Sequence, residues 1–300
     1  MGKRSMKILI VGLPLFAEKL CQDLKNFDPD NQYYWLNTYY NKWHKIIARI
    51  LIPKVDVIYS INGTLGKSRV FDLALAKNKK LMMTWVGTDV TKSKKIRTPN
   101  EEYLQKAHHF CEVSWIKDEL KEMNIDAGIL NFFNFKTQLN AEYPAGTKLK
   151  VLSYMAQNRE DYYGYEKLMS AAKSFPNVDF TIIGTNGKNE KLSNVKFLGW
   201  VDNVSDLMEQ HHVCLRLVEH DGLSGFILEA LYKKRHVIYS EKLNHTVHVK
   251  SETDLHNALD NFKKKLDQQK LEANLPGKKF VEKSFNTDKI LSELIEEFKS

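Results

Sequence analysis

The sequence predicts an α/β protein built from two Rossmann-like, doubly wound domains that face each other across a cleft. Short apolar runs rich in β-branched residues alternate with amphipathic segments of helical period, which is the pattern of a parallel sheet covered by helices. The alternation stops once, between residues 135 and 148, where Pro144 and Gly146 interrupt it, and then starts again. Three hundred residues suffice for two such domains of about 150 residues each.

The first half of the chain has the elements of one such domain, which we place at residues 1–143. Its apolar runs predict six strands, at residues 7–12, 32–36, 56–61, 80–86, 109–113 and 128–132. The helical pattern between them predicts five helices, at residues 16–25, 38–51, 67–77, 101–107 and 116–123.

The second half repeats the pattern, and we place a second domain at residues 144–278. Five strands are expected, at residues 150–154, 178–184, 195–198, 213–218 and 237–239. Four helices are expected, at residues 165–175, 203–210, 225–233 and 251–269. Residues 279–300 form a last helical segment with Ile290, Leu294 and Phe298 on one stripe, which we expect to pack back on the first domain.

The composition, with 43% hydrophobic and 27% charged residues, is that of a globular protein. No run of about 18 apolar residues occurs, so we expect no membrane-spanning helix, and the run at residues 8–11 is too short for a signal peptide. Cys21, Cys111 and Cys214 form no CxxC pair and are typical of reduced packing residues. We therefore expect a cytoplasmic protein, and the charge distribution leaves peripheral attachment to the inner face of a membrane open.

The positive charge lies in the first half of the chain. The net charge is +8, and residues 1–150 hold 24 Lys and Arg against 15 Asp and Glu. Such a field suits an anionic acceptor or an anionic membrane surface. Nucleic acid is not an expected partner, because no recognised nucleic-acid-binding module occurs. One basic cluster follows Asp89 and suits a phosphorylated or lipid-linked acceptor, although most charge runs are simply solvated: Lys92, Lys94, Lys95 and Arg97.

The helix at residues 38–51 allows two interpretations. It carries an apolar stripe beside basic residues, the composition of a helix that adsorbs to an anionic membrane. Every helix of an α/β domain also needs an apolar stripe to cover its sheet, so packing on the sheet is the simpler interpretation. The stripe consists of Trp43, Ile46, Ile47 and Ile50.

The segment at residues 215–231 carries the clearest chemistry. An apolar strand ends at Val218, a polar turn with Gly222 follows, and Ser224 is a good N-cap for the helix after it. The free backbone N–H groups of that first helical turn suit a diphosphate, and Gly222 lets the backbone approach it closely. Asp221 on the turn and Glu229 on the helix are two carboxylates that could hydrogen-bond sugar hydroxyls, although a turn-capping Asp and a solvated Glu would look the same.

The run Asp221-Gly222-Leu223-Ser224-Gly225-Phe226-Ile227-Leu228-Glu229 resembles the acidic-x7-Glu signature of retaining GT-B glycosyltransferases of family 4. The resemblance implies that Glu229 binds the ribose hydroxyls and Asp221 meets the donor sugar. It also implies that the backbone of Gly222, Leu223 and Ser224 meets the phosphates. Asp221 departs from the Glu usual at that position, and Glu219 is an alternative.

Further resemblance extends over residues 148–240. The segment 151–164 is similar to the first strand of the nucleotide-binding domain and its phosphate loop, which implies Arg159 as a pyrophosphate ligand, although Tyr163 replaces a common lysine. The segment 195–201 is similar to the strand that reads the base, which implies Trp200 and Val201. In the first half, the remaining correspondences are a shortened glycine loop and a carboxylate that could hydrogen-bond sugar: Gly12 and Asp89.

The resemblance implies metal-independent transfer of a sugar from a nucleotide diphosphate sugar to an acceptor hydroxyl with retention. A UDP-sugar is expected rather than a GDP-sugar, with no other cofactor, and a cell-envelope glycan or glycolipid precursor as acceptor. The alternative is a non-catalytic GT-B-like binding or chaperone subunit of another transferase. Hydrolases, dinucleotide oxidoreductases and P-loop kinases are disfavoured, because no GxSxG, GxGxxG or P-loop lysine motif occurs.

Overall fold

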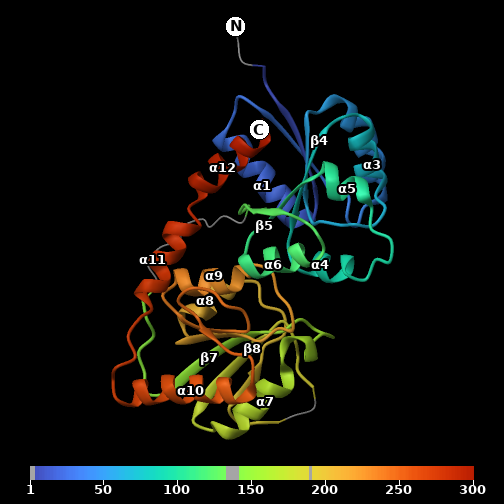
Figure 1. Ribbon diagram of the computed structural model, residues 1–300. Coiled ribbons are helices and arrows are strands. Elements are labelled where there is room, and N and C mark those ends of the chain that lie inside the picture. The colour runs from blue at the N-terminus through green and yellow to red at the C-terminus, as the bar shows by residue number, and fades with distance from the viewer. Residues whose placement is uncertain (1–3, 133–141, 189–190) are drawn as a thin grey trace. The chain divides into compact units, whose positions relative to one another are not determined.

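The structure, a computed structural model, describes residues 4–132, 142–188 and 191–300. The chain forms two compact units (Figure 1). Unit 1 comprises residues 1–135 and 285–300, and unit 2 comprises residues 136–284. Each unit holds one six-stranded sheet whose strand pairs are all parallel, which confirms the α/β, doubly wound class. Residues 135–141 of the predicted linker lie outside the described residues.

The sheet of unit 1 has the strand order β2-β1-β3-β4-β5-β6. Its strands are β1 (Lys7–Gly12), β2 (Gln32–Leu36), β3 (Val57–Ile61), β4 (Lys80–Trp85), β5 (His108–Cys111) and β6 (Ala127–Ile129). Its helices are α1 (Pro14–Phe27), α2 (Lys42–Leu51), α3 (Arg69–Ala76), α4 (Thr88–Ser93), α5 (Glu101–Lys106), α6 (Ser114–Glu122) and α12 (Thr287–Lys299), with a 3-10 turn at Ile52–Lys54. The strand order reverses between β1 and β3, which makes the carboxyl ends of these two strands the expected ligand position.

Both faces of this sheet are covered, which explains why its strands are almost continuously apolar. On one face Leu9 and Val11 pack with Ala48 of α2 and with α3. On the other lie α1 and α12 (Figure 1). The Phe298 ring of α12 packs 5.6 Å from that of Tyr59.

The return of the chain to unit 1 begins later than the sequence suggested. Residues 280–300 form two helices rather than one, because α11 (Leu275–Ser284) ends before Asn286, whose side chain caps α12 by accepting from the Lys289 N–H at 3.0 Å. Helix α11 contacts α9 and belongs to unit 2. Of the segment expected at residues 279–300, residues 285–300 are part of the compact unit 1 and residues 279–284 of unit 2.

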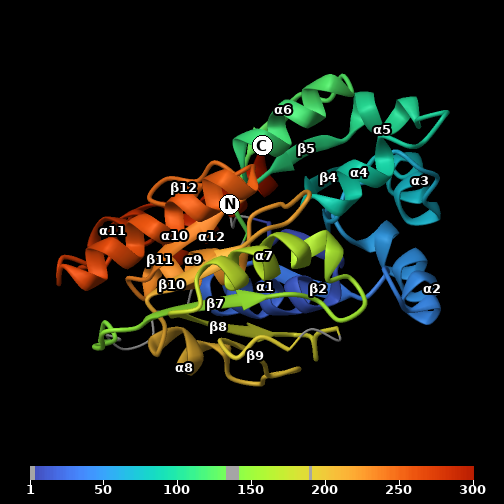
Figure 2. The ribbon, with the colours of Figure 1, turned by 90° about the horizontal axis from the view of Figure 1, so that it is seen from below.

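The sheet of unit 2 has the order β12-β11-β10-β7-β8-β9. Its strands are β7 (Leu149–Tyr154), β8 (Val178–Ile183), β9 (Val195–Phe197), β10 (Val213–Arg216), β11 (His236–Tyr239) and β12 (Val247–His248). Its other helices are α7 (Tyr165–Ser174), α8 (Val204–Glu209), α9 (Gly225–Tyr232) and α10 (Glu252–Asp267), with a 3-10 turn at Asp161–Tyr163. Helices α7 and α10 lie side by side on one face of the sheet (Figures 1 and 2). The order reverses between β7 and β10, so the ligand position of unit 2 is expected at their carboxyl ends.

Candidate functional site

The loops after β7 and β10 carry most of the donor residues expected from the sequence, and they meet at the reversal point of unit 2. Arg159 lies on the first loop, and its guanidinium stacks 4.4 Å from the centre of the Tyr162 ring. The Tyr162 hydroxyl donates to the carbonyl oxygen of His220 on the second loop, and the Glu219 N–H donates to the Tyr162 carbonyl at 3.1 Å. Tyr162 therefore holds the exposed cation of Arg159 beside the β10–α9 loop.

Asp221 is held from two sides within the β10–α9 loop. Arg216 donates from Nε to Oδ2 at 2.5 Å and from Nη2 to Oδ1 at 3.0 Å. The Tyr239 hydroxyl donates to Oδ2 at 2.8 Å and to the Gly222 carbonyl at 3.1 Å. Burial lowers the pKa of Arg216, but the hydrogen bonds and charge of Asp221 outweigh it and raise that pKa above its usual range.

Asp221, which the resemblance implies to meet the donor sugar, is thus engaged by two other side chains of unit 2. Both of its carboxylate oxygens accept from residues that end β10 and β11, so Asp221 fixes the backbone that leads through Gly222 to α9. Arg216 and Tyr239 were not singled out from the sequence. They end two neighbouring strands, which is the signal that could have placed them beside Asp221.

Helix α9 begins at Gly225, as the sequence predicted. Ser224 stands at the N-cap position and is buried, but its side chain makes no capping hydrogen bond, and its carbonyl instead accepts from Ile227 and Leu228. The helix leaves its first N–H groups at the end of the β10–α9 loop, with Leu223 half-buried before them. Glu229 is half-buried on α9, and within residues 4–132, 142–188 and 191–300 its carboxylate has no hydrogen bond or ion pair.

Hydrogen bonds join the β7–α7 loop to the loops after β8 and β9. Glu160 is buried and accepts from the Thr185 hydroxyl at 2.6 Å, a bond that lowers the Glu160 pKa. The Gly184 N–H donates to the Gly199 carbonyl at 2.6 Å, and the Gly199 N–H donates back to Thr185 at 3.1 Å. The four loops thus form one connected edge, of which Glu160 is a link that the sequence reading missed.

The two residues expected to read the base follow Gly199 on this edge. Trp200 is 81% exposed, and its indole Nε1 donates to Asp202 at 2.9 Å. Val201 is half-buried. An exposed indole on an ordered loop offers a flat surface on which a planar ring can stack.

A cavity of about 410 Å³ is lined in part by the loops after β7 and β10, with Tyr162 and Leu217 among its lining residues, but none of the residues assigned to the donor from the sequence lines it. Glu219, the alternative carboxylate, does line it, together with Gly164 and Lys167. Gly164 has φ +73°, and a Cβ there would lie 2.7 Å from Cβ of Leu217, so the close approach of these two loops needs glycine.

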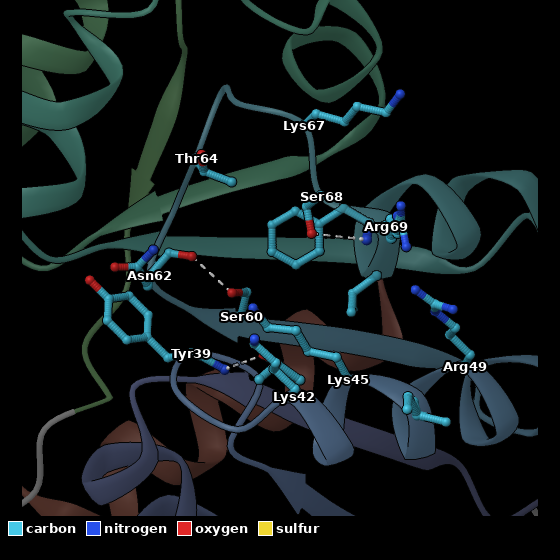
Figure 3. A pocket seen from close by; sticks show the side chains of 15 residues that line it. Tyr39, Lys42, Lys45, Arg49, Ser60, Asn62, Thr64, Lys67, Ser68 and Arg69 are labelled. Carbon is cyan, nitrogen blue, oxygen red and sulfur yellow. Dashed lines mark hydrogen bonds between the residues drawn. The ribbon is translucent and has the colours of Figure 1, made fainter.

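Unit 1 has a pocket of about 580 Å³ at its own reversal point, beyond the ends of β1 and β3 (Figure 3). Gly12 ends β1 and lines it, and Ser60 and Asn62 line it from β3 and the loop that follows. No Asp or Glu is among its lining residues. The five cations that line it come from α2, from the β3–α3 loop and from the start of α3: Lys42, Lys45, Arg49, Lys67 and Arg69.

Asp89, expected from the sequence to hydrogen-bond sugar, is engaged by the backbone of unit 1. The side chain is buried, with 3% exposed, and accepts from the backbone N–H groups of Gly63, Val86, Gly87 and Val90 at 2.6 to 3.1 Å. Burial raises the pKa of Asp89 to about 6, against the opposing effect of these four donors. The residue ties the β3–α3 loop to the loop after β4.

Two of the four residues of the basic cluster after Asp89 have partners within unit 1, and Lys95 and Arg97 are exposed. Lys94 pairs with Glu119 at 2.8 Å and with Glu122 at 3.1 Å. Lys92 donates to the Tyr39 hydroxyl at 3.0 Å. No group of three or more His, Cys, Asp and Glu side chains is arranged to hold a metal ion in the described part of the chain.

The comparisons with known proteins rest on structure alone. No protein-family model matches the sequence, and a search of curated protein sequences found no match. The structure is similar to that of Anabaena HepE in complex with UDP and glucose, with a TM-score of 0.69 and 12% identity over 98% of this chain and 99% of that one. It is similar to the lipopolysaccharide outer core galactosyltransferase WaaB, with a TM-score of 0.66 and 12% identity over 97% and 99%.

The structure is also similar to S. aureus TarM in complex with Fondaparinux, α-GlcNAc-glycerol and UDP, with a TM-score of 0.65 and 14% identity over 86% of this chain. The chain spans 59% of the TarM chain. At such identities these likenesses show the fold, which is that of GT-B glycosyltransferases.

Proposed function

We propose that the protein transfers a sugar from a UDP-sugar to the hydroxyl group of an acceptor. The fold supports this, and so do the neighbours, of which HepE and TarM are described in complex with UDP. The observation that carries the proposal is the contact through Tyr162, which holds Arg159 beside the β10–α9 loop. A cation and the start of a helix at a reversal point are the groups that a diphosphate needs.

In the proposed mechanism Arg159 and the first N–H groups of α9 bind the diphosphate and stabilise the negative charge that develops on it as the glycosidic bond breaks. Glu229 accepts hydrogen bonds from the ribose hydroxyls, and Trp200 with Val201 contacts the base. Asp221 acts as a positioning residue through Arg216 and Tyr239. These groups would neutralise the diphosphate without a metal ion, and we propose that the configuration of the sugar is retained.

The exposed face of α2 supports peripheral binding to an anionic membrane. The expectation that its apolar stripe packs on the sheet is wrong, because Ala48 is the one buried residue of the helix. Trp43 is 75% exposed and Ile50 59%, and Ile46 and Ile47 are also exposed. An interfacial Trp and isoleucines beside lysines suit the headgroup region, so we propose a cytoplasmic protein that acts on an envelope glycan or glycolipid precursor at a membrane surface. The described residues include no helix long and apolar enough to cross a bilayer.

Titration calorimetry with UDP and GDP tests the donor site. We expect the wild type to bind UDP more tightly than GDP, and Glu229→Gln to weaken UDP binding at least tenfold, because a charge-assisted pair of hydrogen bonds is lost. Glu272→Gln is the matched control, since Glu272 is exposed on unit 2 outside the connected edge. Equal UDP affinity in all three proteins would refute the assignment of Glu229. UDP binding without turnover of any donor would favour the non-catalytic subunit.

A further inference from the structure

The pocket of unit 1 gathers positive charge without neutralising it. Neither an ion pair nor a side-chain hydrogen bond involves its five cations within the described residues, and all five are exposed. Lys42, Lys45 and Arg49 repeat at spacings of three and four along α2, so they face the same side of the helix. Figure 3 shows Lys42 and Lys45 near Ser60, and Arg49 on the side of Arg69, which begins the facing helix.

This arrangement is unfavourable to the protein by itself. Like charges at these spacings destabilise a helix, and α2 has little burial to offset that effect because Ala48 is its one buried residue. A surface helix would normally place carboxylates among such lysines, as α10 does with Lys263 and Asp267, whose atoms lie 2.6 Å apart. The three cations of α2 thus lack the counter-charges that such a helix usually carries.

The pocket is also held in shape without a ligand. The β3–α3 loop is tied at Gly63 to Asp89 (2.6 Å), at Leu65 to the Ser93 hydroxyl (3.3 Å) and at Ser68 to the Tyr103 hydroxyl (3.0 Å). At the start of the loop, Asn62 has φ 137°, a conformation unusual for any residue but glycine. Backbone strain that the surrounding structure maintains is typical of ligand sites.

We propose that this pocket binds the phosphate groups of an acceptor that carries at least two negative charges, and that it thereby selects phosphorylated acceptors. That the ligand is an acceptor rests on the proposed function. That the pocket binds phosphate rests on the pocket alone. Guanidinium groups of Arg49 and Arg69 match phosphate oxygens in pairs, while the lysines act as point charges.

A concave site favours a discrete ligand over a flat surface. The cavity of about 580 Å³ is of the size that small-molecule sites have, whereas a membrane would contact the exposed apolar face of α2. The hydroxyl groups of Ser60, Thr64 and Ser68 line the same cavity and could hydrogen-bond a sugar or glycerol that carries the phosphate.

Titration calorimetry of the full chain with inorganic pyrophosphate tests the phosphate site. We expect the double variant Lys45→Ala/Arg49→Ala to bind pyrophosphate at least tenfold more weakly than wild type, because two charged contacts are lost. Lys54→Ala, which removes an exposed cation of unit 1 outside the pocket, is expected to bind within twofold of wild type. Circular dichroism melting verifies that all variants are folded.

Arg159→Ala separates this site from unit 2. Retained pyrophosphate binding in Arg159→Ala, with loss in the pocket variant, supports the proposal. No binding by wild type, or loss in Arg159→Ala with none in the pocket variant, overturns it. The proposed function can also fail separately. If the protein neither binds UDP nor transfers a sugar from any nucleotide sugar, but the pocket variant still loses pyrophosphate binding, the proposed function is refuted and the phosphate site is not.

Competition against pyrophosphate then identifies the source of the phosphate. A water-soluble dimer of glycerol phosphate represents a phosphodiester glycan, and a short isoprenyl diphosphate represents a lipid-linked acceptor. Displacement by either supports an acceptor of that kind, provided that the pocket variant abolishes it. If neither displaces pyrophosphate, the pocket does not hold an acceptor phosphate and the proposal fails.

Discussion

Arg216 and Asp221 form a two-point ion pair across the turn that joins β10 to α9, with contacts of 2.5 and 3.0 Å between atoms that are largely buried. The pair joins residues five positions apart and fixes the path of the backbone through Gly222 into the helix. If the first turn of α9 is to bind a diphosphate, its N–H groups must already point at the ligand, and this pair is what orients them.

Asp221→Asn is therefore expected to lower the free energy of unfolding. The substitution leaves Arg216 buried without its counter-charge, which costs about 3 to 5 kcal/mol for buried pairs. Urea unfolding of the variant measures the effect. Asp260→Asn is the matched control, because its pair with Lys264 is exposed and is worth about 0.5 kcal/mol or less. Equal effects of the two substitutions would show that the Arg216 pair does not hold the loop.

Asp89→Asn is expected to loosen the pocket of unit 1. The amide of asparagine keeps one acceptor oxygen, but its NH₂ group replaces the other oxygen and faces the backbone N–H donors. About 1 to 3 kcal/mol of stability should therefore be lost. The β3–α3 loop depends on the bond from Gly63, so pyrophosphate affinity should fall too, although Asp89 does not line the pocket. Unfolding and calorimetry on the same variant measure both effects, and a variant of unchanged stability would contradict the structural role of Asp89.

Gly12→Ala should destabilise unit 1 strongly. Gly12 has φ +104°, and a Cβ would lie 2.2 Å from the Ile61 carbonyl oxygen, which is backbone and cannot turn away. Strain of this kind costs about 1 to 3 kcal/mol before the clash is added. Gly66→Ala is the control, since its nearest neighbour is the flexible end of Ile96 at 3.3 Å. Thermal melting should separate the two variants by several degrees, and similar melting temperatures would count against the geometry of the β1–α1 turn.

We expect the exposed face of α2 to bind anionic membranes. Ile50→Ser should weaken binding to vesicles of phosphatidylcholine and phosphatidylglycerol about tenfold, since burying an isoleucine side chain contributes about 1.5 to 3 kcal/mol. Ile129→Ser is the matched control, because Ile129 is an isoleucine of unit 1 on β6 that is 50% exposed, against 59% for Ile50. Cosedimentation measures both variants. Wild-type protein that does not sediment with these vesicles would refute membrane docking.

Stability should fall on mild acidification because of His212. Its side chain is fully buried, and burial lowers the pKa from 6.5 to about 4. Between these two pKa values the folded state thus binds fewer protons than the unfolded state. The contribution of neutral His212 to the free energy of unfolding is therefore complete above pH 6.5. It is lost as pH falls toward 4, by up to about 1.4 kcal/mol per pH unit. His212→Asn, which can still accept from the Lys150 N–H, should flatten the dependence of urea unfolding on pH. An unchanged slope would show that His212 is not responsible.

The strands were predictable because both faces of a parallel sheet are buried. The apolar runs predicted the bounds of β1 and β2 to the residue. The pattern of strands and helices that starts again after residue 148 predicted a second unit. The packing of helix α2 was predicted wrongly for a physical reason. An apolar stripe shows that a helix has an apolar face, but it does not show whether that face packs against the sheet or against another surface. The short helix α4 and the two-residue strand β12 have too few residues to show a period.

The site was only partly predictable. The turn into α9 and Arg159 could be placed because glycine and charge follow an apolar strand. The partners that organise them could not, since Tyr162, Glu160 and Arg216 act through contacts between loops that are far apart in sequence. Asp89 was given a role in binding because the sequence around a carboxylate that follows a strand is the same in two cases. The carboxylate can accept hydrogen bonds from a ligand or from the backbone of a neighbouring loop.

The most direct test of the central claim is UDP release from a panel of UDP-sugars, with GDP- and ADP-sugars as comparison and phosphorylated glycans as acceptors. We predict that the wild type releases UDP from at least one donor and only with acceptor present, and that Glu229→Gln lowers kcat/KM at least tenfold while Glu272→Gln does not. No turnover of any donor by the wild type, together with unchanged UDP affinity in Glu229→Gln, would contradict the account.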